Sequence, residues 1–248
     1  MVVEPLLCYS MRMDLLRAQN EASELLAEAL APFGVSGWVR VALVGTWNVG
    51  GERSVPLLDG SIVRISHDER GAPFALGMDG TEDHNLLVSL TDEKGVAACA
   101  AAQTDGSADL RGLGIDLASP EDFAGERGEQ FNPLIFSASE QRVALMLADD
   151  EALGFAFVFS AKEAAFKACA APLRRWYDEH DEELAFDLTE FELAAPRDVR
   201  GTLRHAHAAR AMAAMGVRVR IVRREICGFA CSIAIAENAK KGLGTVSK

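Results

Sequence analysis

The fold of this chain is decided by the stretch FSAKEAAFKA at residues 159–168. Ser160 is a residue type that caps helices, and Glu163 three positions later completes a capping-box spacing, so the pattern predicts a helix that begins at residue 160. Glu163 and Lys167 are four residues apart and therefore lie on one face of this helix. The alanines at 164, 165 and 168 keep the helix slim, so another element can approach it closely. The simplest interpretation of the spacing alone is a solvated Glu–Lys pair, which stabilises a helix by about 0.3 kcal/mol.

A second stretch, GLGIDL at residues 112–117, has the composition of a short buried strand that carries one carboxylate, Asp116. A single Asp after an apolar strand is often only a turn former. The order of the two stretches, and the 47 residues from Asp116 to Glu163, change this interpretation. Gly-Ile-Asp followed by FSAKEAxxKA resembles the two signature motifs of the 4′-phosphopantetheinyl transferases. The chain is similar to the long, single-chain type of this family, because its 248 residues allow two half-domains.

Hydrophobic periodicity predicts the other elements of the chain. Apolar residues at helical spacing predict helices at 11–32, 139–147 and 202–215, and the motif helix is expected to end near residue 172. Alternating or β-branched runs predict strands at 38–44, 62–65, 74–76, 86–90, 96–102, 112–117, 184–193, 217–222 and 228–236. Turns or loops are expected at 48–52, 91–95 and 125–128. Helices and antiparallel strands occur in both halves, which makes the fold class α+β.

The polar segment at residues 103–109 has the most linker-like composition in the chain. We therefore expect an N-terminal half at 1–108, a C-terminal half at 109–237 and a disordered tail at 238–248. The family resemblance implies more than this division: two similar half-domains related by a pseudo-twofold axis, with the active site in the cleft between them. Residue identities reveal no internal repeat, so the duplication rests on the resemblance.

The resemblance also implies a reaction. In this family a serine hydroxyl of a carrier protein attacks coenzyme A at the phosphorus attached to pantetheine, and adenosine 3′,5′-bisphosphate leaves. Asp116 and Glu163 match the ligands of Mg²⁺, an ion that takes carboxylate, phosphate and water oxygens together. Glu163 or a water on the metal would take the serine proton, and Lys167 would contact the phosphates and stabilise the leaving charge. Lys162 has no assigned role and could equally be a solvated side chain.

Three positions depart from the family pattern. Ala118 stands where many members have a second acid, two residues after Asp116. Leu90 stands where a histidine is expected to hold the 3′-phosphate of coenzyme A, and leucine can donate nothing to a phosphate. Ala72 precedes Pro73 where a basic residue is common, so Arg70 or His67 would have to serve instead.

Hydroxyl and basic groups near these positions remain as candidates for binding coenzyme A. Ser89 and Thr91 keep the hydroxyls on either side of residue 90, and Lys94 could supply positive charge. The other interpretation of this stretch is an ordinary strand end followed by a turn. The residues predicted to bind coenzyme A are Lys167, Ser89, Thr91, Lys94, Arg70 and Pro73.

Composition limits the classes of function. With 49% hydrophobic and 25% charged residues, the chain is neither disordered nor fibrous, and no apolar run is long enough to cross a bilayer. The N-terminus lacks the pattern of a signal peptide, and the five cysteines are scattered among apolar neighbours, so we expect buried free thiols in a cytoplasmic protein. A net charge of -12 argues against nucleic-acid binding. We expect a monomer with no membrane partner.

Carrier proteins of this kind are acidic, so docking requires a local basic surface. The second half of the chain supplies ten arginines: Arg174, Arg175, Arg197, Arg200, Arg204, Arg210, Arg218, Arg220, Arg223 and Arg224. Besides an active transferase, two alternatives stay open. One is a transferase-fold protein that only binds carrier protein or coenzyme A, and the other is an unrelated α+β protein with an accidental motif match.

Overall fold

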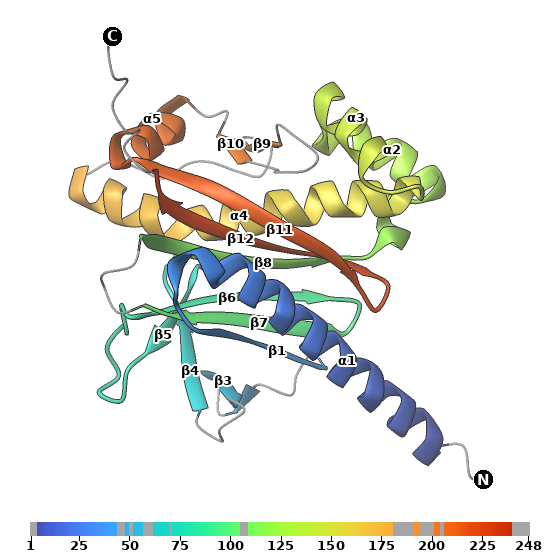
Figure 1. Cartoon of the computed structure of the whole chain (residues 1–248), viewed down its shortest axis with the longest axis horizontal. Helices are drawn as coiled ribbons and strands as arrows, with labels where there is room; N and C mark the ends of the chain where they lie inside the picture. Colours follow the sequence, from blue (N-terminus) through green and yellow to red (C-terminus); the bar gives the residue numbers. More distant parts are fainter. Residues whose placement is uncertain are drawn as a thin grey trace.

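A computed structural model of the chain describes residues 4–43, 48–49, 52–56, 62–69, 71–104, 109–180, 191–193, 201–203 and 206–239. Two three-stranded antiparallel sheets lie at its centre (Figure 1). The first has the order β1-β7-β6 and consists of β1 (Gly37–Leu43), β7 (Val96–Gln103) and β6 (Leu86–Glu93). The second has the order β11-β12-β8 and consists of β11 (Val217–Ile226), β12 (Phe229–Asn238) and β8 (Leu110–Ala118). This combination of helices and antiparallel sheets confirms the α+β class.

Smaller elements surround the two central sheets. A four-stranded sheet has the order β2-β3-β4-β5, with β2 (Asn48–Val49), β3 (Glu52–Pro56), β4 (Ile62–His67) and β5 (Pro73–Leu76). A two-stranded sheet consists of β9 (Phe191–Leu193) and β10 (Gly201–Leu203). The helices are α1 (Glu4–Leu30), α2 (Gly125–Ile135), α3 (Ala138–Leu147), α4 (Glu151–His180) and α5 (Ala206–Met215), with short 3₁₀ helices η1 (Ala31–Phe33) and η2 (Pro120–Phe123). None of the described helices has the length and apolarity needed to cross a membrane.

Strand alternation separates the two faces of the second central sheet. Odd-numbered residues of β12, such as Ile233 and Ile235, pack in a cluster with α1, whereas the alanines at 230, 234 and 236 pack with α4. On β8, Ile115 and Leu117 likewise face the α1 side. Asp116 between them therefore points to the other face, toward α4.

The first helix packs on its sheets through the apolar stripe that the sequence predicts. The buried residues of this stripe include Ala18, Ala22, Leu25, Leu26 and Ala29. At its C-terminal end, Arg220 of β11 donates to the Ala29 carbonyl and lies 5.6 Å from the centre of the Phe33 ring. Arg224 donates to Glu24 at 3.0 Å. These contacts join α1, from the first half of the chain, to a strand of the second half.

The two central sheets meet through side-chain hydroxyls of β6. The Ile115 N–H donates to Ser89 Oγ at 3.0 Å, and the Leu117 N–H donates to Thr91 Oγ1 at 3.5 Å. Both hydroxyl residues are buried. The contact brings a strand of the first half beside β8, which carries Asp116.

Two glycines allow β8 to approach α4 as closely as the slim alanine face predicted. A methyl group added at Gly112 would collide with the carbonyl oxygen of Ala168, and one added at Gly114 would collide with that of Ala164. Contact at this distance is possible only because neither residue has a Cβ. The glycines therefore set the separation between Asp116 on the strand and the acid and lysine on the helix.

Gly114→Ala should lower the free energy of unfolding by roughly 1–3 kcal/mol or more, because the added methyl has no room and β8 must move away from α4. Thermal or denaturant unfolding, followed by circular dichroism, measures this change. An unaltered midpoint would mean that the strand and helix separate without cost, which would contradict the close packing.

The motif helix is longer than predicted at both ends. It begins at Glu151, where Asp150 Oδ1 accepts from the Leu153 N–H at 3.1 Å, so the predicted cap at Ser160 is wrong. The helix also continues through Pro172. Loss of one backbone hydrogen bond there costs about 3 kcal/mol, but the burial of neighbouring residues such as Leu173 offsets that cost.

Other boundaries also differ from prediction. Strand β6 extends to Glu93, so the predicted turn at 91–95 is a two-residue hairpin with Lys94 at φ 47° and Gly95 at φ 84°. The predicted loop at 125–128 is the start of α2, the predicted turn at 48–52 includes parts of two short strands, and the helix predicted at 202–215 begins only at Ala206. Among the described cysteines, three are buried free thiols as predicted, but Cys227 is exposed.

Parts of the predicted organisation stay predictions. The division near residue 108 and the pseudo-twofold axis belong to this group. Residues 184–190 of the predicted strand 184–193 lie outside the described part of the chain, as does the predicted tail from residue 240 onward. The predicted start of that tail at residue 238 is wrong, because Asn238 is the last residue of β12. The described elements do give each half one long helix and a three-stranded antiparallel sheet (Figure 1).

Candidate active site

Asp116 is the centre of the predicted site. It lies on β8 and is 4% exposed. Lys167 Nζ donates to its Oδ1 atom at 2.6 Å, and the Thr91 hydroxyl donates to the same atom at 2.8 Å. Lys167 Nζ also donates to the Ile115 carbonyl at 3.3 Å. Lysine 167 is therefore paired with Asp116 across the β8–α4 contact, which contradicts the simple interpretation of a surface pair with Glu163.

Glu163 lies one turn before Lys167 on α4 and is half-buried. Burial raises the pKa of its carboxyl, the negative charge of Asp116 raises that pKa further, and Lys167 opposes both effects. The same competition acts on Asp116: burial raises its pKa, although Lys167 and Thr91 favour the charged form. The structure thus brings the two predicted acids and the predicted lysine into electrostatic contact.

One atom of this group is left without a partner. Asp116 Oδ2 is buried and, among the residues that the structure describes, has no hydrogen-bond partner. A buried carboxylate oxygen of this kind is costly unless a donor or a cation reaches it. A cation between Asp116 and Glu163 would also relieve the repulsion between the two acids.

Two carboxylates suit Mg²⁺ better than they suit a metal that needs three or more ligands from the protein. No cluster of three or more His, Cys, Asp or Glu side chains suited to a metal occurs in the described ranges. Mg²⁺ does not need such a cluster, because it is usually held by one or two carboxylates together with substrate phosphates and water. Asp116 and Glu163 would supply those carboxylates, and Ala118, buried on the same strand, supplies none.

The residues predicted to bind coenzyme A are spread over several environments. The hydroxyls of Ser89 and Thr91 are used in the β6–β8 contact described above. Lys94 forms an exposed ion pair with Asp122 at 2.9 Å. Pro73 is the first residue of β5 and is half-buried, whereas Arg70 lies outside the described residues. Leu90 packs against an apolar cluster between β6 and the four-stranded sheet.

Thr91 and Glu93 are two neighbours of the site whose positions the sequence did not reveal. Thr91 was expected to reach a phosphate, but its hydroxyl binds Asp116. Glu93 was placed in a turn, yet it lies on β6, where burial and then the charge of Asp122 raise its pKa and Asp116 adds to the effect. Period-two alternation from Ser89 through Thr91 to Glu93 is the signal that could have placed all three on one face.

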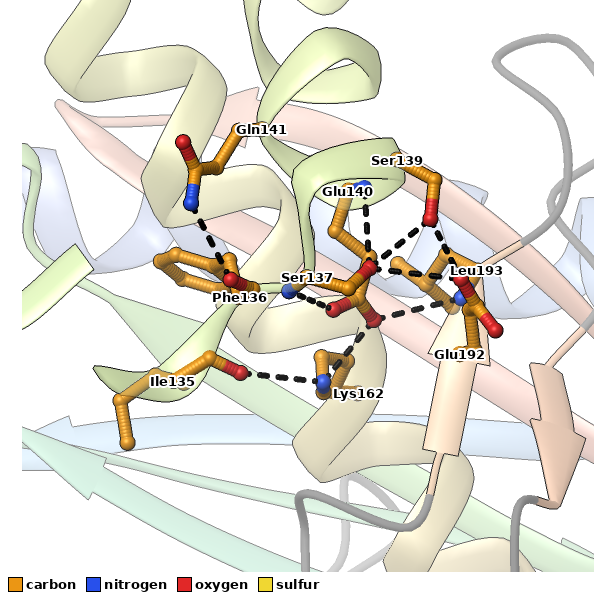
Figure 2. A network of polar contacts seen from close by, with 9 residues as sticks. All are labelled: Ile135, Phe136, Ser137, Ser139, Glu140, Gln141, Lys162, Glu192 and Leu193. Carbon is orange, nitrogen blue, oxygen red and sulfur yellow. Dashed lines mark hydrogen bonds and ion pairs between the residues drawn. The ribbon is translucent and has the colours of Figure 1, made fainter. Parts of the chain in front are cut away.

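Lys162 is completely buried, so the alternative of a solvated side chain is wrong. Figure 2 shows its surroundings. Its Nζ atom donates to Glu140 Oε1 at 2.8 Å and to the Ile135 carbonyl at 3.3 Å, and both side chains of the ion pair are 0% exposed. Ser160, the predicted cap, is also buried and lies 2.7 Å from Ser232 of β12, oxygen to oxygen.

The segment that contains this site matches a known protein family. Residues 112–222 match the family model described as the 4′-phosphopantetheinyl transferase superfamily, and the match includes Asp116, Glu163 and Lys167. The curated proteins contain no match. One similar solved structure is titled "Chronobacterium ammoniagenes ACPS-CoA complex"; it is 22% identical, covers 51% of this chain and 96% of its own, and has a TM-score of 0.38.

Proposed function

We propose, from the match of residues 112–222 to the 4′-phosphopantetheinyl transferase superfamily, that the chain transfers the 4′-phosphopantetheine arm of coenzyme A to a carrier-protein serine. The observation that supports this most directly is the buried contact between Asp116 and Lys167 beside Glu163. The reaction requires groups that bind a pyrophosphate and a group that accepts the proton of a hydroxyl. A lysine beside two carboxylates can supply both. A cytoplasmic location is part of the same proposal.

The proposed step forms a bond from the serine oxygen to the phosphorus attached to pantetheine and breaks the bond from that phosphorus to the oxygen of adenosine 3′,5′-bisphosphate. Lys167 has three donors, two of which go to Asp116 and Ile115, so one can hold the leaving phosphate. Glu163 is the proposed acceptor for the serine proton. Mg²⁺, held by Asp116 and Glu163, would neutralise the pyrophosphate charge.

A transfer assay on a purified apo carrier protein tests this function. Chain, coenzyme A and Mg²⁺ are mixed with the carrier, and mass spectrometry detects the added phosphopantetheine arm. Transfer that stops on chelation of the metal supports the proposal. Binding of coenzyme A or carrier without transfer would instead support a binding protein, the alternative favoured by Leu90, Ala118 and the engaged hydroxyls of Ser89 and Thr91.

Docking of the acidic carrier on the second half is also a proposal, and the structure limits how it can be tested. Arg218, Arg220 and Arg224 donate to groups of β12 or α1 in the same chain. Reversing their charge would therefore disturb the fold as well as any docking surface. Paired Arg174→Glu and Arg175→Glu changes, which should raise the carrier KM, are the remaining test of this surface; the side chains of both residues lie outside the described set.

Leu90→His should tighten the binding of coenzyme A several-fold, because a histidine at this position would add a donor for the 3′-phosphate. Isothermal titration of both proteins with coenzyme A measures the change. The 3′-dephospho form of coenzyme A is the control, and its affinity should stay the same. Equal changes for the two ligands would mean that residue 90 does not lie at the 3′-phosphate.

A further inference from the structure

The buried ion pair between Lys162 and Glu140 is an unusual way to hold two helices together. Lys162 is the largest fully buried side chain in the described residues, and it lies in the apolar contact of α4 with α3. Removing two charges from water costs several kcal/mol per ion, and well-packed apolar residues often do as well or better. A contribution to stability is therefore a weak explanation for this ion pair. A role in fixing the position of α4 explains it better.

Both partners are held in fixed positions (Figure 2). Glu140 belongs to a capping box at the start of α3, where its Oε2 atom accepts from the Ser137 N–H at 2.8 Å. Its Oε1 atom, which binds Lys162, also accepts from the Leu193 N–H of β9 at 3.3 Å. Lys162 therefore donates to an anchor that α3 and β9 define together.

This anchor adds a fully buried directional contact to an α4 interface that is otherwise largely apolar. Most of that interface consists of apolar side chains, such as Ala161, Ala164 and Ala168, which are buried but make contacts that do not depend on angle. The hydrogen bonds that Nζ donates depend on both distance and angle. Among the polar contacts of this part of α4, the Lys162–Glu140 contact joins two charged groups that are both completely buried.

We infer that the Lys162–Glu140 pair sets the rotation of α4 about its own axis and so positions Glu163 and Lys167 opposite Asp116. Glu163 is the next residue after Lys162, and Lys167 follows four residues later. A rotation of ~20° would move the end of a side chain at a radius of about 6 Å by ~2 Å. Misplacement by about 1 Å can cost roughly 100-fold in rate, so this pair acts on catalysis through Glu163 and Lys167. The inference rests on the proposed transfer function.

The test is the double variant Glu140→Gln with Lys162→Met. Glutamine preserves a capping box, and removing both charges leaves neither one buried alone. We expect a melting temperature close to that of the parent chain, an unchanged KM for the carrier and a kcat lower by roughly 10- to 100-fold. Mn²⁺ affinity, measured by electron paramagnetic resonance without substrate, should fall as well, because the two acids no longer face each other correctly. A purely structural pair would move neither kcat nor Mn²⁺ affinity in a folded variant.

Ser139→Ala is the matched control, because it removes a bond to Glu192 at the edge of the same network without touching Lys162. Its kcat and Mn²⁺ affinity should equal those of the parent. Parental values in the double variant, an equal loss in Ser139→Ala, or failure of the double variant to fold would each overturn the positioning role. Absence of transfer by the parent chain would overturn the proposed function instead, and the Mn²⁺ comparison would still decide the positioning role.

Discussion

Glu163→Gln should reduce transfer by roughly 1,000-fold or more, because the change removes one of the two carboxylates available to Mg²⁺ and also the proposed proton acceptor. Glutamine has nearly the same volume as glutamate, so the packing of α4 is preserved. Single-turnover transfer to an apo carrier, read by mass spectrometry, measures the loss. Coenzyme A should still bind in the absence of metal, since Lys167 is unchanged.

The same variant should not be less stable than the parent chain. Burial raises the pKa of Glu163, and the charge of Asp116 raises it further. A group with a raised pKa in the fold contributes stability below its ordinary pKa and loses that contribution as pH rises through the raised value. Without metal, Glu163→Gln should therefore be as stable as the parent at acidic pH and more stable at neutral pH. Transfer at the parental rate by this variant, at ordinary Mg²⁺ concentration, would show that Glu163 is not a metal ligand.

Asp116→Asn tests the other predicted metal ligand. Its carboxylate binds both Lys167 and Thr91, so an amide at this position leaves the lysine without its anionic partner. Transfer should fall as far as in Glu163→Gln. Loss of the lysine's partner lowers the free energy of unfolding, whereas removal of a buried carboxylate whose pKa burial raises acts in the opposite direction, so the net change at neutral pH should be within about 1 kcal/mol. A folded variant without transfer would therefore assign the loss to the site.

The sequence correctly predicted which residues are buried where the burial follows from the spacing of apolar residues along one helix. The apolar stripe of α1 and the slim alanine face of α4 follow from helical periodicity, and both are buried as predicted. The element that meets the alanine face of α4 is β8, where Gly112 and Gly114 leave room for the contact. The proximity of Asp116, Glu163 and Lys167 followed from the family motifs, because periodicity alone does not bring together residues 47 positions apart.

The start of α4 and the burial of Lys162 were not predicted. The first depends on competing local signals, and the second on a partner that is distant along the chain. Both Ser160 and Ser137 have capping-box spacing, and of these two only Ser137 caps a helix. The apolar residues 152–159 favour continuation of the helix, so the signal at Ser160 is overridden. Lys162 finds Glu140 only after α3 and α4 have packed, and no spacing rule connects those two positions.

Lys167→Met should lower transfer by roughly 100- to 1,000-fold, because it removes the positive charge that would stabilise the leaving phosphate. Asp116 Oδ1 would keep its bond from Thr91 but lose the one from Lys167, so the free energy of unfolding should fall by about 1–3 kcal/mol. Mn²⁺ should bind at least as tightly as in the parent, because the ammonium no longer competes for Asp116. Loss of turnover with retained metal affinity would separate the role of Lys167 from that of Glu163.

Arg127→Met is the matched control for this lysine. Arg127 pairs with Asp122 at 2.6 Å, the same distance as Lys167 to Asp116, but its side chain is 71% exposed. An exposed pair contributes about 0–1 kcal/mol, so this variant should keep parental stability and turnover. If Lys167→Met transferred at the parental rate while losing stability, the lysine would be a structural partner of Asp116, and the phosphate would have to be held by other groups.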